Sequence, residues 1–197
     1  MPYIQAPYII AEVENGDVLV VGRNSGGRIG TEFLGCISGE LTSTWINLGI
    51  NSPKIIATGQ DATFIQKSDN TLWATGGSSQ NGAIFSTQSY LQEFTETTVS
   101  KFWEEDIGEN IKSIQVRNSS TMLTTTSGHI YCAGSLLHNA FSGLSKTERP
   151  DIGTNVLKLD STYSLGAIAP SSFNAVLIGS DNKYYDMVYL QQGTLSF

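Results

Sequence analysis

One cluster of acidic and aromatic residues in this sequence could do chemistry on sugars. Phe102 and Trp103 are followed directly by Glu104, Glu105 and Asp106. Glycoside cleavage requires a pair of carboxylates, and aromatic rings provide flat surfaces for sugar rings. Adjacent carboxylates on one loop usually point apart, however, so a solvated acidic loop is the competing interpretation. A carbohydrate-binding or glycan-active protein is therefore kept as an alternative hypothesis.

The histidines and cysteines do not have the spacing of a metal site. No cysteine, aspartate or glutamate stands at metal-ligand spacing from His129 or His138. Cys36 and Cys132 lie far apart without a CxxC pair, so we expect two buried or half-buried thiols rather than a disulfide framework. No G-x-S-x-G nucleophile motif is present either. The sequence predicts no catalytic residue, no metal and no cofactor.

The glycine-rich segment from Gly22 to Gly30 could be taken for a phosphate-binding loop. Such a loop lies between a strand and a helix, whose N-terminal amides hold the anion. The residues that follow, Thr-Glu-Phe-Leu-Gly at 31–35, break too soon for a helix. We therefore expect these glycines to serve the fold.

The composition indicates a folded protein and excludes several classes of partner. The 197 residues are 40% hydrophobic and 15% charged, and their net charge of −7 repels a phosphate backbone, so nucleic acid is not expected as a partner. The longest apolar runs, such as Val18–Val21, are far shorter than the ~20 residues of a membrane helix. The first ten residues lack the pattern of a signal peptide. We expect a soluble protein without membrane insertion, whose localisation the sequence leaves unknown.

A strand–turn–strand pattern occurs four times along the chain. The clearest copy is 62–76; it recurs 58 positions later at 120–134, 54 positions earlier at 8–22, and in weaker form at 174–185. Each copy has a two-residue turn of types that tolerate positive φ, as tight hairpins require. The four turns are Asn15-Gly16, Asp69-Asn70, Ser127-Gly128 and Asp181-Asn182.

Further strands are predicted ahead of the later hairpins. Residues 54–58 and 111–116 show the apolar alternation of half-buried strands, and 167–169 is a weaker counterpart. The stretches 26–51, 80–110 and 136–155 are polar and punctuated by glycine, so we expect long irregular loops there.

Short strands recurring about every 50 residues are typical of a β-propeller, in which each blade hides its faces against its neighbours. A solenoid is the main competitor, but its period is shorter. We predict an all-β, propeller-like array of about four blades in a single domain over 1–197. The repeats span about 8–53, 54–110, 111–155 and 156–197.

Two segments resemble the repeats of the regulator-of-chromosome-condensation family. Residues 22–30, Gly-Arg-Asn-Ser-Gly-Gly-Arg-Ile-Gly, are similar to its G-x-N-x-x-G-Q-L-G segment, with Arg28 in place of Gln. Residues 71–78, Thr-Leu-Trp-Ala-Thr-Gly-Gly-Ser, resemble its D-G-x-L-W-x-W-G-x-N hairpin, and residues 130–134 fit the same place. The resemblance assigns a structural role in the repeat to Gly22, Gly27, Gly30, Trp73, Gly76, Tyr131 and Gly134.

The resemblance also raises the question of how the ring is closed. It implies a seven-bladed propeller, and four repeats of this length cannot form seven blades. The array is therefore small, open, or completed by another chain, and residues 1–6 and 188–197 are candidates for closing strands.

Without a catalytic motif, the sequence favours a non-enzymatic interaction or structural module. We expect it to bind a protein partner, or identical subunits within a larger assembly such as a virion. Trp45 and Trp103 are expected in loops between repeats, where they could anchor a partner, whereas Trp73 should pack between blades. The candidate binding residues are Trp45, Phe102, Trp103, Glu104 and Glu105. Carbohydrate binding is the alternative, and a guanine-nucleotide-exchange role is implied by the resemblance only.

Overall fold

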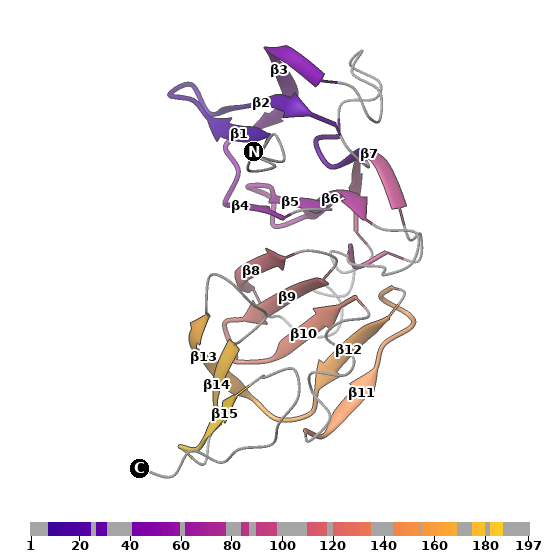
Figure 1. Cartoon of the computed structure of the whole chain (residues 1–197). Helices are drawn as coiled ribbons and strands as arrows, with labels where there is room; N and C mark the ends of the chain where they lie inside the picture. Colours follow the sequence, from indigo (N-terminus) through magenta and orange to yellow (C-terminus); the bar gives the residue numbers. More distant parts are fainter. Residues whose placement is uncertain are drawn as a thin grey trace, which may run out of the picture.

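The computed structural model describes most of the chain between residues 8 and 186. The described residues are 8–24, 27–30, 41–59, 62–77, 84–86, 90–97, 110–117, 120–134, 144–153, 155–168, 175–179 and 182–186. They form antiparallel sheets without an α-helix, which confirms the prediction of an all-β fold (Figure 1). We call the four sheets blades 1 to 4 in chain order.

The blades contain three to five strands each among the described residues. Blade 1 has the order β1-β2-β3 and blade 2 the order β4-β5-β6-β7. Blade 3 has the order β11-β12-β10-β9-β8, and blade 4 the order β13-β14-β15. The strands are β1 (Ile9–Glu12), β2 (Asp17–Arg23), β3 (Leu41–Asn51), β4 (Ile55–Thr58), β5 (Ala62–Gln66), β6 (Leu72–Gly77), β7 (Tyr90–Glu96), β8 (Ile111–Arg117), β9 (Ser120–Thr125), β10 (Ile130–Ala133), β11 (Lys146–Glu148), β12 (Val156–Leu159), β13 (Tyr163–Ile168), β14 (Ala175–Gly179) and β15 (Tyr184–Asp186).

The four predicted hairpins are present as β1–β2, β5–β6, β9–β10 and β14–β15. Gly16, Asn70, Gly128 and Asn182, the second residue of each predicted turn, all have positive φ, at 87°, 72°, 90° and 58°. Only glycine and, less readily, asparagine adopt this conformation at low cost. The turn residues therefore fixed the places of the hairpins.

The predicted strands ahead of the hairpins are also found. Strands β4, β8 and β13 pair with the first strand of each of the last three hairpins. The weak prediction at 167–169 was too late and too short, because β13 begins at Tyr163. The candidate closing segments, 1–6 and 188–197, lie outside the described residues.

The prediction that the stretches between repeats are irregular was wrong. Strands β3, β7 and β11 lie inside the stretches 26–51, 80–110 and 136–155, where β3 and β7 form the outermost strands of their blades and β11 covers β12. In β3 the apolar alternation is confined to Ile46, Leu48 and Ile50, and the residues before them, Leu-Thr-Ser-Thr-Trp at 41–45, do not alternate. An outer strand packs one part of one face only, so its pattern is short.

The hydrophobic core lies between successive blades. One cluster joins blades 2 and 3 and includes Phe64, Phe85, Leu123 and Tyr131. The Phe64 and Phe85 rings meet edge to face, with centroids 6.1 Å apart at an angle of 67°. A smaller cluster around Val18 joins blades 1 and 2, and another packs Val20 of blade 1 against Ile29 of the segment after β2. Blades 1, 2 and 3 therefore each depend on a neighbour, as expected for a repeat array.

The glycine-rich segment after β2 also ties blade 1 to blade 2. The Asn24 side-chain oxygen accepts a hydrogen bond from the Ile29 amide at 3.3 Å, which folds the segment into a compact turn. Two buried threonines of blade 2 then donate hydrogen bonds to its carbonyl groups. Thr63 Oγ1 lies 2.7 Å from Arg28 O, and Thr75 Oγ1 lies 2.7 Å from Gly27 O.

Candidate functional site

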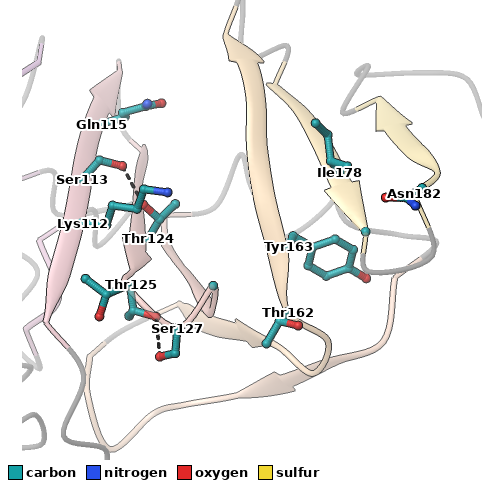
Figure 2. A pocket seen from close by; sticks show the side chains of 13 residues that line it. Lys112, Ser113, Gln115, Thr124, Thr125, Ser127, Thr162, Tyr163, Ile178 and Asn182 are labelled. Atoms are coloured by element: carbon teal, nitrogen blue, oxygen red, sulfur yellow. Dashed lines mark hydrogen bonds between the residues drawn. The ribbon is translucent and has the colours of Figure 1, made fainter.

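A cleft opens between blade 3 and blade 4. Its volume is about 650 Å³, and Figure 2 shows the two blades facing each other across it. Strand β8 lines one wall together with the end of β9 and the turn after it. The start of β13, the end of β14 and the turn that follows β14 line the other wall. The lining residues are Lys112, Ser113, Gln115, Thr124, Thr125, Thr126, Ser127, Gly128, Thr162, Tyr163, Ile178, Gly179 and Asn182.

Hydroxyl groups dominate the wall that blade 3 contributes. Ser113 Oγ and Thr124 Oγ1 are 2.6 Å apart, and Thr125 Oγ1 and Ser127 Oγ are 3.4 Å apart, as the dashed lines in Figure 2 show. In each pair one hydroxyl donates to the other, so oxygen lone pairs and one hydroxyl proton per pair stay available. This wall can therefore both donate and accept hydrogen bonds.

The two blades are joined at one end of the cleft by the backbone. The amide of Tyr163 donates a hydrogen bond to the carbonyl oxygen of Gly128 at 2.9 Å. Tyr163 is buried, whereas Thr162 and Asn182 on the same wall are exposed. The cleft thus has a fixed end at the hairpin turn of blade 3.

A second, smaller cleft lies between blade 2 and blade 3. Its volume is about 400 Å³, and it is lined by Lys54, Ile55, Gln66, Asn70, Asn110, Ile111 and Lys112. The Lys54 ammonium donates a hydrogen bond to the Asn70 side-chain oxygen at 2.6 Å. Lys112 lines both clefts and is exposed. Its side-chain ammonium makes no hydrogen bond or ion pair with any other residue that the structure describes.

The two clefts are related by the repeat. In blade 2, Ile55 pairs with Gln66. The two residues 58 positions further along, Ser113 and Thr124, pair in the same way in blade 3. Lys54 and Lys112 therefore occupy equivalent places at the start of β4 and β8. The pairing of β8 with β9 shifts register at Lys112, between Ile111 and Ser113. A shift of this kind redirects a side chain out of the regular alternation.

Of the predicted binding residues, Trp45 is the one that lies within the described part of the chain, and it lines neither cleft. Trp45 was expected in a loop, and this is wrong, because it lies on strand β3 with half of its surface exposed. Phe102, Trp103, Glu104 and Glu105 lie outside the described residues, as does Asp106. None of the cleft residues was predicted, although the offset of 58 between Lys54 and Lys112 could be seen in the sequence.

The predicted repeat residues take part in the blades. Gly22, Gly27, Gly30, Gly76 and Gly134 all have positive φ. Tyr131 is buried in the cluster between blades 2 and 3. Trp73 is only half-buried. The Lys67 ammonium lies over its ring, 3.4 Å from the centroid, in a cation–π contact. The Trp73 Nε1–H donates a hydrogen bond to Thr71 Oγ1 at 3.0 Å.

The remaining titratable groups do not form a reactive site among the described residues. Burial raises the pKa of the Cys132 thiol, which keeps it protonated and inert. In the part of the chain that the structure describes, no three histidine, cysteine or acidic side chains gather as metal ligands. No helix within those residues is long and apolar enough to cross a membrane.

Comparison with known proteins identifies the fold through structure alone. The sequence matches no protein-family model and no curated protein. Yeast RCC1 (Prp20), solved bound to Kap60, is similar with a TM-score of 0.61 and 16% identity over 93% of this chain. Prp20p from Saccharomyces cerevisiae, solved with a study of its binding to Gsp1p and histones, is similar with a TM-score of 0.62 and 16% identity over 91% of this chain. Human WBSCR16 is similar with a TM-score of 0.62 and 12% identity over 91% of this chain.

The fold is that of an RCC1-like β-propeller. The chain spans less than half of each of these structures, covering 43%, 42% and 44% of their lengths. Within the residues that the structure describes, these sheets do not close into a ring. Among the described residues, β1 has no inner neighbour in blade 1 and β15 has no outer neighbour in blade 4. The prediction of an all-β, propeller-like array of about four blades is therefore confirmed.

Proposed function

We propose that this chain is a non-enzymatic interaction module that binds an acidic segment of a partner protein in its inter-blade clefts. The observation that carries the proposal is the pair of equivalent clefts that share Lys112. A segment lying across Lys112 would contact both clefts and reach Lys54 at the far side of the smaller one.

The lining favours a peptide that carries carboxylates. The Lys112 ammonium has three hydrogen-bond donors, and no other described residue occupies them. The hydroxyl and amide groups around it can pair with peptide N–H and C=O groups. A single exposed lysine–carboxylate pair contributes only about 0.2–1 kcal/mol. The affinity must therefore come from several contacts along the segment, and moderate, salt-dependent binding is expected.

The structural neighbours support a protein as the partner. Yeast RCC1 was solved with Kap60 bound, and Prp20p was studied for its binding to Gsp1p and histones. Those partners belong to those proteins. For this chain, the fact that similar propellers bind proteins supports a protein as the general class of partner.

The two alternative functions have less support. Carbohydrate binding depends on residues 102–106, which lie outside the described residues. A guanine-nucleotide-exchange role depends on the likeness of fold, and fold does not determine function. Neither alternative accounts for the equivalent lysine-bearing clefts.

The proposal is tested by peptide binding measured with fluorescence polarisation. Labelled decapeptides of alternating Glu and Ser, alternating Gln and Ser, and alternating Lys and Ser serve as probes. We expect the Glu peptide alone to bind, and Lys112→Glu to weaken its binding by about threefold or more, because the reversal removes one lysine–carboxylate pair and adds a repulsion. Lys146→Glu, the same charge reversal on the outer strand β11 of blade 3 and away from both clefts, should leave affinity within about twofold. Equal binding of the Glu and Gln peptides, or an unaffected Lys112→Glu variant, would refute the proposal.

A further inference from the structure

Blade 1 has two apolar faces, and the residues that the structure describes cover only one of them. Alternate residues of its strands point to opposite faces. Val18, Val20 and Ile50 point toward blade 2 and are buried there. The register pairs Ile9 with Val21, and Leu41 with Arg23, on the opposite face. We call this opposite face the end face; its apolar residues are Ile9, Leu19, Val21, Leu41 and Trp45.

The end face carries three of the four large hydrophobic side chains that are exposed among the residues whose burial is described. Ile9, Leu41 and Trp45 are 54%, 62% and 51% exposed. Val13, beside β1, is the only other large hydrophobic residue exposed among the described residues. The strands equivalent to β1 in blades 2 and 3, which are β5 and β9, are buried along their whole length. The end face thus has the character of a blade–blade interface without the second blade.

The outer strand of blade 1 also lacks the usual protection of a sheet edge. Natural edge strands carry charged residues or proline that discourage pairing with another chain. Strand β7 contains Glu93 and Glu96, and β11 is Lys-Thr-Glu. Strand β3 has eleven residues with neither a charge nor a proline. The shifts in register between β2 and β3 twist this edge, but they leave Leu41 and Trp45 exposed.

We propose that the end face binds the end face of a second copy of this chain, with the two blades packed face to face about a two-fold axis. Such an arrangement repeats the apolar sheet packing that already joins blades 1 and 2. Two chains of net charge −7 repel each other, so an interface between them needs attractive charge pairs to offset the repulsion. Asp17 and Arg23 are the charged residues of the end face and lie at opposite ends of β2.

The two-fold packing makes this charge pattern complementary to itself. With the two β2 strands antiparallel, Asp17 of one copy approaches Arg23 of the other, twice per dimer. Asp17 is held in place by side-chain amides of Asn15, Asn47 and Asn51, at 2.9, 3.1 and 3.1 Å. A three-stranded face is smaller than the about 800 Å² per partner of a standard interface, so association in the micromolar range is expected.

Sedimentation velocity and light scattering over about 1 to about 200 μM chain test this proposal. The expected result is a mass that rises from 21.3 kDa toward twice that value. Leu41→Glu and Trp45→Glu should each hold the chain at the monomer mass, and Arg23→Asp should weaken association by about fivefold or more. Ser161→Glu, at an exposed site on the other end of the array, is the matched control and should associate like the parent.

Two outcomes would overturn the proposal. One is a monomer mass for the parent chain over the whole range, which would leave the end face to a different partner. The other is unaltered association of both Leu41→Glu and Trp45→Glu. Thermal unfolding of each variant guards against misfolding, and since both side chains are largely exposed, the melting temperatures should stay close to that of the parent. The peptide assay reports on the clefts of blades 2 to 4, so the two proposals can fail separately.

Discussion

One carboxylate organises the turn of the clearest hairpin. Asp69 Oδ1 accepts hydrogen bonds from the Thr71 amide at 2.9 Å and from Thr71 Oγ1 at 2.6 Å. The same hydroxyl accepts a hydrogen bond from Trp73 Nε1. The Thr71 hydroxyl, then its amide, lower the pKa of Asp69 below the ordinary value for aspartate. A turn position that the sequence identifies by its tolerance of positive φ is thus also a small polar network.

Removal of the Thr71 hydroxyl should raise the Asp69 pKa. In Thr71→Val we expect it to move toward the ordinary value, whereas Thr71→Ser should keep it low. Because the folded-state pKa is depressed, the stabilisation by Asp69 is present above the unfolded pKa and is lost as pH falls through the folded pKa. Carboxyl ¹³C NMR titration measures both variants. Asp160, whose pKa is lowered by Ser145 and Thr147, is the internal control. An unchanged Asp69 titration in Thr71→Val would contradict the assignment.

The Cys132 thiol should be unreactive in the folded chain. Cys132 lies on β10 in the core, and burial raises its pKa, so little thiolate forms at neutral pH. In a Cys36→Ser background, labelling by a disulfide reagent should be at least about 100-fold slower than in urea, because it requires opening of blade 3. Labelling of the folded chain at the rate of the unfolded chain would show that β10 is not held in the core.

At the scale of elements, the hairpins were predictable and the outer strands were not. Gly16 and Asn70 sit where the backbone must adopt positive φ, and this restricts the residue type so strongly that the turn can be read directly. An outer strand such as β3 makes one-sided contact, so residues like Thr42 and Trp45 carry no required pattern. A strand hidden in a polar segment then resembles a loop.

The clefts could not be predicted because they arise from packing between blades. Lys112 and Tyr163 are far apart in the sequence, and they line one cleft only because β8 and β13 start at the same end of successive blades. The repeat offset could place Lys54 and Lys112 at equivalent positions. It could not show that space is left between the blades, since that depends on the size of side chains contributed by both.

A close approach of backbone between blades 2 and 3 makes Gly153 sensitive to substitution. A Cβ at Gly153 would lie 2.7 Å from the Ser86 amide nitrogen and 3.0 Å from the Phe85 carbonyl carbon. Neither backbone atom can move without disturbing the core, so Gly153→Ala should cost about 1–3 kcal/mol in free energy of unfolding.

Gly49→Ala is the matched control for that substitution. Nothing lies within 4 Å of a Cβ at Gly49, so only its φ of +68° opposes alanine, at a cost of about 1 kcal/mol. Urea unfolding compares the two variants. If Gly49→Ala were the more destabilising, the contact between residues 84–86 and 153 would not be important for the packing of the blades.

At the scale of the whole molecule, the array should be most stable in its middle. Each blade is stabilised by its neighbours, and the largest core cluster joins blades 2 and 3. Strands β5 and β9 are buried throughout, whereas the equivalent β1 has a partly exposed pattern in an end blade. Figure 1 shows blades 1 to 3 following one another along the molecule, with blade 4 beside blade 3. The end blades have the fewest packing partners and should open first.

Hydrogen exchange measured by mass spectrometry tests this order of stability. At low chain concentration, amides of β5 and β9 should exchange by global unfolding, and those of β1 should exchange faster by local opening of blade 1. If the end face is covered by a second copy, raising the concentration should slow exchange in β1 and β3 and leave β5 unchanged, because only blade 1 gains a neighbour. Leu41→Glu should abolish that dependence. Uniform exchange in all three equivalent strands would instead mean that the blades unfold as one cooperative unit, and that the open end of the array carries no penalty in stability.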